Sequence, residues 1–127
     1  MKVPGPDHPI TITPKFERVR VLVAGRIIAD TRRALVLQET IYRPVFYIPR
    51  EDADMSLLVA SDHSTYCPYK GKAEYFSIQV GNHIARDAAW SYPRPYPAMS
   101  EIAGRLAFYP TRVDVIEEVE NKDKTDG

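Results

Sequence analysis

The stretch AEYFSIQVGNHIARDAAW, residues 73–90, constrains the fold most strongly because its pattern is that of a β-hairpin. Gly81 and Asn82 separate two runs of strand-forming residues, and this dipeptide favours the positive φ angles of tight hairpin turns. With these two residues as the loop, Val80 lies opposite His83. The same register predicts three further pairs: Phe76 with Asp87, Tyr75 with Ala88, and Ala73 with Trp90.

Side chains alternate between the two faces of a strand, so this register divides the hairpin into an apolar face and a mixed face. The apolar face is predicted to be core and carries Phe76, Ile78 and Val80. The mixed face combines aromatic, amide and guanidinium groups, a composition typical of ligand-contacting surfaces. It carries Tyr75, Ser77, Gln79, Ile84, Arg86, Ala88 and Trp90. Tyr75 and Arg86 are therefore predicted ligand contacts.

Short strand-like stretches recur along the rest of the chain between Gly, Pro and polar residues. Val19, Val21 and Val23 alternate with other residues before Gly25, which predicts a strand, a turn and a second strand over 19–30. Further strands are predicted within 34–40, 44–49 and 112–120. At most one short helix fits. The sequence thus predicts a mainly β, single compact domain of antiparallel strands.

The proline distribution and the end composition suggest three segments. Residues 1–17 are Pro-rich and are predicted to form an extended N-terminal arm, because Pro fixes its own φ and biases the preceding residue to extended forms. Residues 18–119 are predicted to form the β domain. Residues 120–127 are polar and are predicted to be a disordered tail.

Charge and cysteine content exclude several classes of protein. Seventeen basic residues balance seventeen acidic ones, whereas nucleic-acid binders usually show a basic domain or stripe, so no nucleic-acid partner is expected. The single cysteine cannot form an internal disulfide, which fits a reducing compartment. The N-terminus lacks the apolar core of a signal peptide, and no apolar run approaches the ~20 residues of a membrane span. We expect a cytoplasmic protein without membrane contact, either a monomer or a weak homodimer.

Five segments resemble, in order and spacing, the bacterial domain of unknown function (DUF) family 427: ADTRRAL, YIPREDADMSLL, TYCPYKGKAEYFSI, DAAWSYPRPYP and AFYPTRVD. The resemblance spans roughly residues 8–118 and is most specific at CPYKG and AAWSYP. It implies a β-tent fold similar to that of methionine sulfoxide reductase B and of a zinc-bearing Rab-binding chaperone. Those relatives hold zinc with two Cys-x-x-Cys pairs, whereas one cysteine excludes a four-thiolate site here.

The same family also carries a nucleotidyltransferase-like label. The sequence contains neither a Gly-rich loop of the usual kind nor a carboxylate pair followed by a recognisable phosphate cradle. The resemblance therefore implies the fold and brings no activity with it. No cofactor is expected. No metal site is expected either, since the histidines show no metal-ligand spacing.

The first specific block contains the candidate catalytic residues Cys67 and Lys70. A reactive thiol needs a lowered pKa, and Lys70 and His63 are near Cys67 in the sequence. The alternative is a buried, small apolar cysteine at a strand entrance. Lys70 with Gly71 could present an ammonium and free N–H groups to an anion. The alternative is a solvated turn lysine.

The second block, Trp90 to Pro95, combines aromatic rings with rigid prolines. Trp90 and Tyr92 could form a stacking wall for a ligand, or Trp90 could be a core anchor covered by the proline loop. Asp52 matches an acidic position of the family pattern and is a further predicted ligand contact, although charge runs such as residues 50–54 are usually solvated. Glu39 ends an apolar strand and is predicted to reach solvent or to pair with an arginine such as Arg43.

Two hypotheses for function follow. In the first, a binding or enzymatic site for a small anionic or nucleotide-like molecule lies between Cys67–Gly71 and Trp90–Pro95. In the second, these residues are structural, and the chain is a non-catalytic protein-interaction module. A ligand-sized cavity lined by Cys67, Lys70 and Trp90 distinguishes the first from the second.

Overall fold

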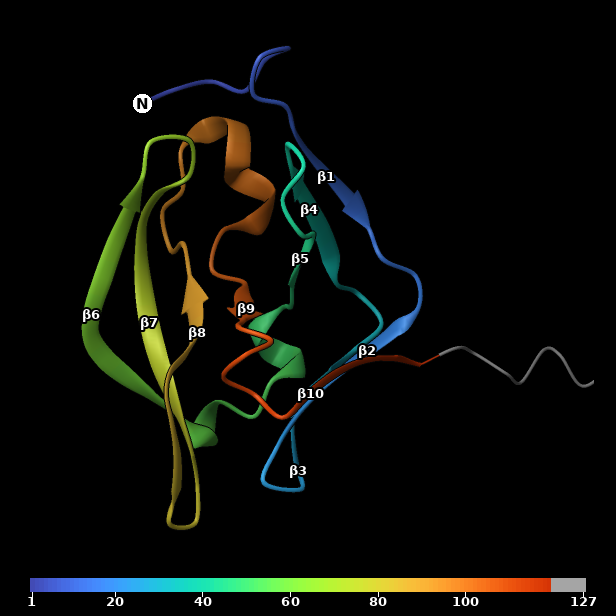
Figure 1. The fold of residues 1–127 in the computed structure, drawn as a ribbon, viewed down its shortest axis with the longest axis vertical. Helices are drawn as coiled ribbons and strands as arrows, with labels where there is room; N and C mark the ends of the chain where they lie inside the picture. Colours follow the sequence, from blue (N-terminus) through green and yellow to red (C-terminus); the bar gives the residue numbers. More distant parts are fainter. Residues whose placement is uncertain (120–127) are drawn as a thin grey trace, which may run out of the picture.

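The computed structural model describes residues 1–119, and its regular structure consists mainly of β-strands (Figure 1). The predicted tail, residues 120–127, lies outside the described residues. The strands are β1 (Ile10–Pro14), β2 (Arg18–Val23), β3 (Arg26–Thr31), β4 (Leu35–Glu39), β5 (Val45–Tyr47), β6 (Leu58–Cys67), β7 (Gly71–Val80), β8 (His83–Ser91), β9 (Leu106–Phe108) and β10 (Val115–Val119). Three short 3-10 helices accompany them: η1 (Arg50–Asp52), η2 (Met55–Leu57) and η3 (Pro97–Ile102).

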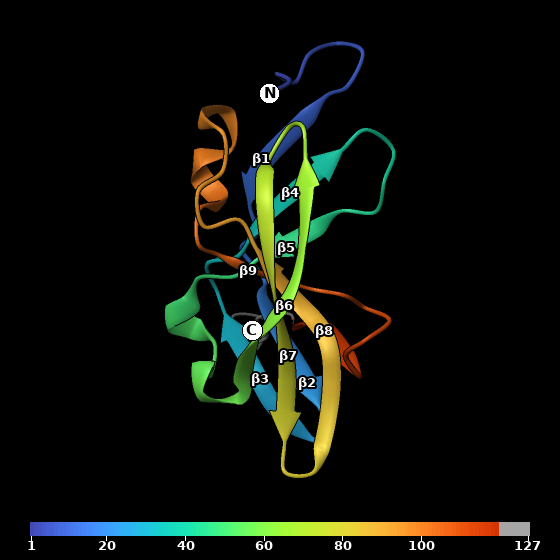
Figure 2. The same cartoon turned by 90° about the vertical axis from the view of Figure 1, so that its left-hand side faces the viewer.

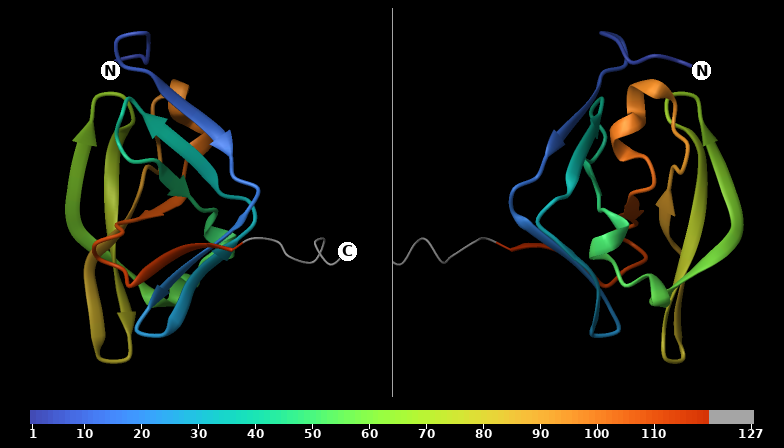
Figure 3. Two further views of the ribbon diagram at one scale, coloured as in Figure 1. Left: turned by 45° about the vertical axis from the view of Figure 1, so that its right-hand side comes forward. Right: turned by 180° about the vertical axis from the view of Figure 1, so that it is seen from behind.

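The strands form three antiparallel sheets, ordered β1-β4-β5, β10-β2-β3 and β6-β7-β8-β9. The four-stranded sheet makes one side of the molecule and the two three-stranded sheets make the other (Figure 1). Views from the front and from behind agree that η3 lies between the upper ends of the two sides (Figure 3). The mainly β architecture predicted from the sequence is therefore confirmed, with no α-helix in residues 1–119.

The structure adds detail to the N-terminal segment and to residues 50–57, which precede β6. Within the predicted arm, Ile10–Pro14 pair with β4 as strand β1. Residues 50–57 hold two single 3-10 turns, of which η2 is capped by the Asp54 side chain accepting a hydrogen bond from the Ser56 N–H. No helix in the described part of the chain is both long enough and apolar enough to cross a membrane.

The hairpin exists with the predicted turn, but the predicted register holds only next to that turn. Val80 pairs with His83 and Ile78 with Ala85, after which the register shifts and Phe76 pairs with Ala89. The cause is a bulge at Asp87, which has a φ of +48° and donates its N–H to the Ser77 hydroxyl at 3.1 Å. The predicted Phe76–Asp87 pair is thus wrong.

The bulge shifts the register of β7 and β8 by two residues. Because side chains alternate with a period of two, each residue stays on its predicted face. Tyr75 lies directly opposite Trp90 on the same face, instead of opposite Ala88.

Strand β7 is buried on different faces at its two ends. Ala73 and Tyr75 are buried near its start, while Phe76 and Ile78 are buried further along and Gln79 is exposed. Alternation puts the odd- and even-numbered side chains on opposite faces. Strands twist along their length, and bulges increase this twist. The face of Ala73 and Tyr75 therefore points inward near the start of β7, and the face of Phe76 and Ile78 points inward further along.

Two buried clusters result, one under each half of the four-stranded sheet. The lower cluster contains Phe76, Ile78 and the valines of β2, and the upper one contains Leu37, Tyr47, Tyr75, Tyr92, Met99 and Ile102. Figure 2 shows β4 and β5 behind the upper half of β6 and β7, and β2 and β3 behind the lower half. Burial of each large apolar side chain stabilises the fold by about 1.5–3 kcal/mol. Unlike the lower cluster, the upper one is rich in tyrosine and therefore contains polar atoms.

Strand β6 was not recognised in the sequence beyond a strand entrance at Cys67. The structure makes Cys67 the last residue of this ten-residue strand, where it pairs with Gly71. Strand β6 lies at the edge of its sheet and most of its residues are exposed. An edge strand that buries neither face lacks the alternation that marks a strand in sequence.

Candidate functional site

The two specific sequence blocks meet at the upper end of the four-stranded sheet. The Tyr96 N–H donates a hydrogen bond to the Lys70 carbonyl at 3.1 Å. Gly71 has a φ of +106°, and a Cβ there would lie 3.5 Å from the Arg94 carbonyl oxygen. A glycine is needed at this position because its φ lies outside the region that residues with a side chain adopt easily.

Lys70 is buried, with only 7% of its surface exposed, and its charge is neutralised by Glu39. The Lys70 Nζ lies 2.5 Å from Glu39 Oε1, and the other oxygen of Glu39 lies 2.7 Å from His8 Nε2. The His8 ring in turn stacks on Tyr69 with 4.1 Å between ring centroids. The alternatives predicted for Glu39, solvent or Arg43, are both wrong, and Lys70 is not a solvated turn lysine.

The surroundings of Glu39 lower its pKa. Burial would raise the pKa of this carboxyl group, but hydrogen bonds from Lys70 and His8 outweigh burial, so the pKa lies below its usual value of 4.5. Ionised Glu39 therefore stabilises the folded state above about pH 4.5. This contribution is lost as the pH falls through the lower pKa of the folded protein.

We expect the Glu39→Gln variant to lose part of the acid sensitivity of the protein. The melting temperature of the wild type should fall more steeply between neutral and acid pH than that of the variant, because only the wild type has a carboxylate to protonate there. Thermal unfolding followed by circular dichroism over this pH range measures the difference. Parallel curves would show that Glu39 is not responsible.

An aromatic cavity of about 210 Å³ lies beside this ion pair. Its walls come from β4, β5, β7 and β8 and from residues next to strands, including Lys70 before β7, Tyr92 after β8 and Tyr109 after β9. The aromatic side chains of the lining include Tyr47, Tyr75, Trp90, Tyr92 and Tyr109. The Trp90 ring packs against Tyr109 with 4.3 Å between centroids, and its Nε1–H donates to the Tyr47 hydroxyl at 3.4 Å. The hydroxyls of Tyr75 and Tyr109 are 3.2 Å apart. These contacts hold the rings in fixed positions around the cavity.

The hydroxyls of Tyr47, Tyr92 and Tyr109 stay protonated at neutral pH because the pKa of each is raised. Burial raises the pKa of Tyr47 and of Tyr92 well above the usual value of 10. Burial, followed by the hydrogen bond with Tyr75, raises the pKa of Tyr109 to about 12. Tyr92 is only 7% exposed, and its hydroxyl makes no hydrogen bond with another residue of 1–119. Among the side-chain nitrogen and oxygen atoms of residues 1–119, only Arg20 Nε is both fully buried and without a partner, so the Tyr92 hydroxyl remains accessible from the cavity that Tyr92 lines.

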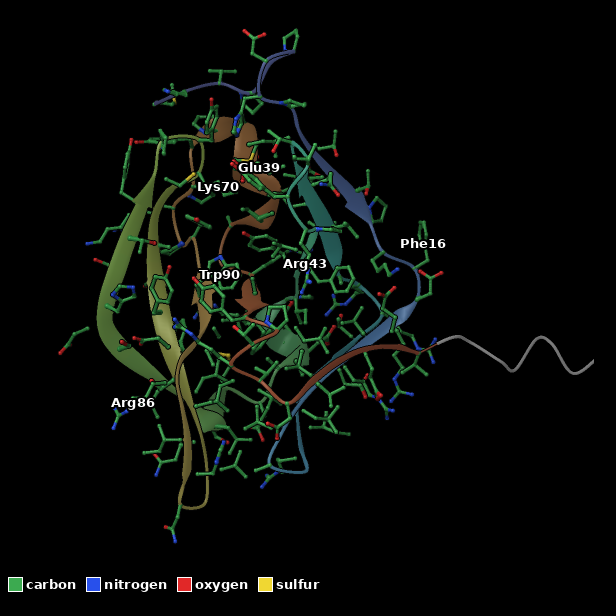
Figure 4. The ribbon with its side chains drawn as sticks, in the orientation of Figure 1. Phe16, Glu39, Arg43, Lys70, Arg86 and Trp90 are labelled. Atoms are coloured by element: carbon green, nitrogen blue, oxygen red, sulfur yellow. The ribbon has the colours of Figure 1, made fainter. Side chains whose placement is uncertain are left out.

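A second, larger concavity of about 480 Å³ adjoins the cavity. The two share the lining residues Arg43, Val45, Trp90 and Tyr109. The larger one is a mainly apolar groove, lined further by Val21, Pro44, Phe46, Ile48, Phe108, Pro110, Ile116 and Glu118. Trp90 and Arg43 lie on opposite sides of the space between the sheets (Figure 4).

Arg43 is the charged residue at the boundary between cavity and groove. It is exposed, and within residues 1–119 its guanidinium makes no hydrogen bond or ion pair. Arginine side chains in folded proteins often pair with carboxylates, but Glu39 is already bound by Lys70 and His8. Arg43 therefore remains available to an anion from outside the chain.

The structure brings together only some of the residues predicted as a site. Lys70, Tyr75, Trp90 and Tyr92 line the cavity, whereas Gly71 is not in its lining and lies against the backbone of Arg94 and Pro95. Cys67 does not line it. The Cys67 thiol packs in the upper cluster with its Sγ 3.9 Å from Lys70 Nζ, and the His63 ring lies instead on Tyr75, 4.4 Å between centroids.

Asp52 and Arg86 lie elsewhere. Asp52 accepts a hydrogen bond from the Thr31 hydroxyl at 2.7 Å and pairs with Arg33 at 3.2 Å, so it fastens η1 to β3. Arg86 lies near the lower end of β8, away from Lys70 (Figure 4), in a shallow concavity with Gln79 and Ser77.

The sequence alone does not identify Tyr47, Tyr109 and Glu39 as neighbours of Lys70. One signal was present for Glu39. Leu35, Leu37 and Glu39 alternate along β4, so they share a face, and Leu37 is buried. That pattern indicates an inward carboxylate, which requires a partner. Nothing local in the sequence indicates that Lys70, thirty-one residues away, is that partner.

The family model described as "Domain of unknown function (DUF427)" matches residues 11–119. A search of curated proteins finds no match. Within the described residues, no group of three or more His, Cys, Asp or Glu side chains could hold a metal ion.

Proposed function

We propose that this chain, which belongs to the DUF427 family, binds a small organic molecule in the space between its sheets. The observation that carries the proposal is the aromatic cavity joined to an apolar groove through shared walls. The groove falls within the ~300–1,000 Å³ typical of small-molecule pockets, and such pockets combine apolar walls with a few placed polar groups. A planar or apolar body fits the groove, and the polar groups of the cavity fit one end of the ligand.

The wall residues favour binding over a purely structural role. Tyr and Trp rings offer large contact areas with few rotatable bonds, so little side-chain entropy is lost when they bind a ligand. In an interaction module with structural aromatic residues, these rings would fill the space between the sheets. The cavity beside Lys70 and Trp90 instead supports the ligand hypothesis, although Cys67 is not among its walls.

Trp90 provides a built-in test of the proposal. It is the only tryptophan of the chain and lines both the cavity and the groove, so its fluorescence reports occupancy. We expect titration with 3-phenylpropionate and with adenosine monophosphate, excited where neither absorbs, to change Trp90 emission saturably with at least one of them. An unchanged emission with both probes at millimolar concentration would contradict the proposal.

Two variants locate the binding. Val45→Phe enlarges a side chain on the shared wall and should weaken the titration about tenfold or more. Ile84→Phe makes a comparable change at an exposed position outside both concavities and should leave it unchanged. Equal titrations for the two variants would place the probe outside the space between the sheets.

We expect Cys67→Ala to bind the same probe with an affinity within about twofold of the wild type. The thiol packs behind Lys70 and is not part of the cavity wall. The same Trp90 titration measures this. If Cys67→Ala lost binding while its melting temperature stayed at the wild-type value, Cys67 would have to contact the ligand.

A further inference from the structure

The aromatic cavity beside Lys70, from here on the inner cavity, offers hydrogen-bond donors that residues 1–119 leave unused. The Tyr92 hydroxyl has no partner within residues 1–119, although Tyr92 is more than nine-tenths buried. The Tyr47 hydroxyl accepts from Trp90 but donates to no described residue. Because burial keeps the pKa of both hydroxyls high, both carry their protons at neutral pH.

The acceptors of the cavity are, by contrast, already engaged. Glu39 is the only carboxylate in its lining, and its two oxygens are bound by Lys70 and His8. The charges of Lys70 and Glu39 cancel, so Arg43 leaves the lining with a net positive charge. A ligand that brought only donors would find no free carboxylate there.

We infer that the ligand carries an oxyanion head, a carboxylate or a phosphate, that enters the inner cavity while its body occupies the apolar groove. The inference rests on the proposed binding function and adds the chemical class of the ligand. Oxygens of the head accept hydrogen bonds from Tyr92 and Tyr47, and Arg43 at the boundary supplies the opposing charge. Charge-assisted hydrogen bonds of this kind are short and roughly twice as strong as neutral ones. They offset the cost of removing the anion from water.

This arrangement assigns Lys70 a different role from the one predicted for it. With Glu39 at 2.5 Å, its ammonium cannot act as the main charge for a ligand anion. Lys70 instead provides part of the cavity wall, and Arg43 takes the charged role. Arg43 and Tyr92 are therefore the residues that should determine which ligand class binds.

Three probes that share a phenyl ring on a short carbon chain test the head group: 3-phenylpropionate, 3-phenylpropanol and 3-phenylpropylamine. With Trp90 emission as the readout, we expect the acid to bind most tightly and the amine most weakly, with about tenfold or more between them. Phenyl phosphate, added as a fourth probe, tells a carboxylate site from a phosphate site. Whichever of 3-phenylpropionate and phenyl phosphate binds more weakly carries the head group that suits the cavity less well.

Variants test which residues recognise the head group of the ligand. Arg43→Gln and Tyr92→Phe should each lower the preference for the acid over the alcohol. The matched control is Arg86→Gln, since Arg86 is also exposed and without a hydrogen bond or ion pair within residues 1–119 but lies away from the cavity. It should keep the wild-type preference. Melting temperatures of all three variants show whether each is folded.

The outcomes separate this inference from the proposed function. If all three phenyl probes bind equally, or the amine binds best, the oxyanion head is wrong while a binding site remains. If no probe changes Trp90 emission, the binding site itself is contradicted. If the acid is preferred but Arg43→Gln and Arg86→Gln reduce that preference equally, the assignment to Arg43 is wrong.

Discussion

Replacing Glu39 with alanine is expected to destabilise the protein by about 3 kcal/mol, because it leaves the buried ammonium of Lys70 without its counter-charge. The Lys70 side chain is 9% exposed and that of Glu39 is 19% exposed, so solvent compensates for little of the loss. His8 also loses its side-chain partner, which removes one of the contacts between the N-terminal segment and β4. Chemical denaturation measures the change in the free energy of unfolding.

Two companion variants identify the cause of this loss. The double variant Glu39→Ala/Lys70→Met removes both charges and should recover to within about 1 kcal/mol of the wild type, since a buried pair replaced by apolar groups is often close to neutral. The control Glu118→Ala breaks the more exposed Lys15–Glu118 pair and should cost less than about 1 kcal/mol. If the double variant is as unstable as Glu39→Ala, the unpaired Lys70 is not the reason.

Gly71→Ala is expected to destabilise the protein by about 2 kcal/mol through backbone strain. The φ of +106° at Gly71 lies well beyond the left-handed region near +57° that other residues can reach. A Cβ at this position would meet the Arg94 carbonyl oxygen at an ordinary contact distance of 3.5 Å. The conformation, and not a clash, is therefore the cause of the loss.

The hairpin turn supplies the matched control for this substitution. Gly81 has a φ of +59°, inside the left-handed region, and a Cβ there has nothing within 4 Å. Gly81→Ala should cost about 1 kcal/mol, less than Gly71→Ala. Because Gly71 follows Lys70, its substitution should also weaken probe binding at Trp90, whereas Gly81→Ala should not. If Gly71→Ala and Gly81→Ala lost the same stability and the same binding affinity, the segment Cys67–Gly71 would not depend on the φ of +106° at Gly71.

Local patterns predicted most of the strands and the main turn. The alternating valines of β2 and the Gly-Asn dipeptide each determine structure within a few residues, and both predictions are confirmed. The register beyond the turn was wrong because the bulge at Asp87 depends on a hydrogen bond across the hairpin to Ser77. Asp tolerates a positive φ, but nothing in the sequence marks this aspartate among the others.

Contacts between distant segments explain what the sequence could not show about the site. The blocks around Lys70 and Trp90 were recognised because each is distinctive by itself, and they are neighbours in the structure. The partner of Lys70 is supplied by β4 and the opposite aromatic wall by β5 and the segment after β9. Those contacts follow from how the three sheets pack. Arg86 and Asp52 share the chemistry of ligand contacts, yet the same packing places them elsewhere.

The binding of a ligand between the sheets is tested most directly by the indole N–H signal of Trp90 in a ¹⁵N–¹H correlation spectrum. This signal is unique, since the chain has one tryptophan, and the N–H donates to Tyr47 inside the cavity. We predict that 3-phenylpropionate shifts it saturably, together with the backbone signals of Val45 and Tyr92, while the turn residues Gly81 and Asn82 remain unchanged. A spectrum in which the Trp90 signal does not move, or in which only residues of the outer hairpin respond, would contradict the account.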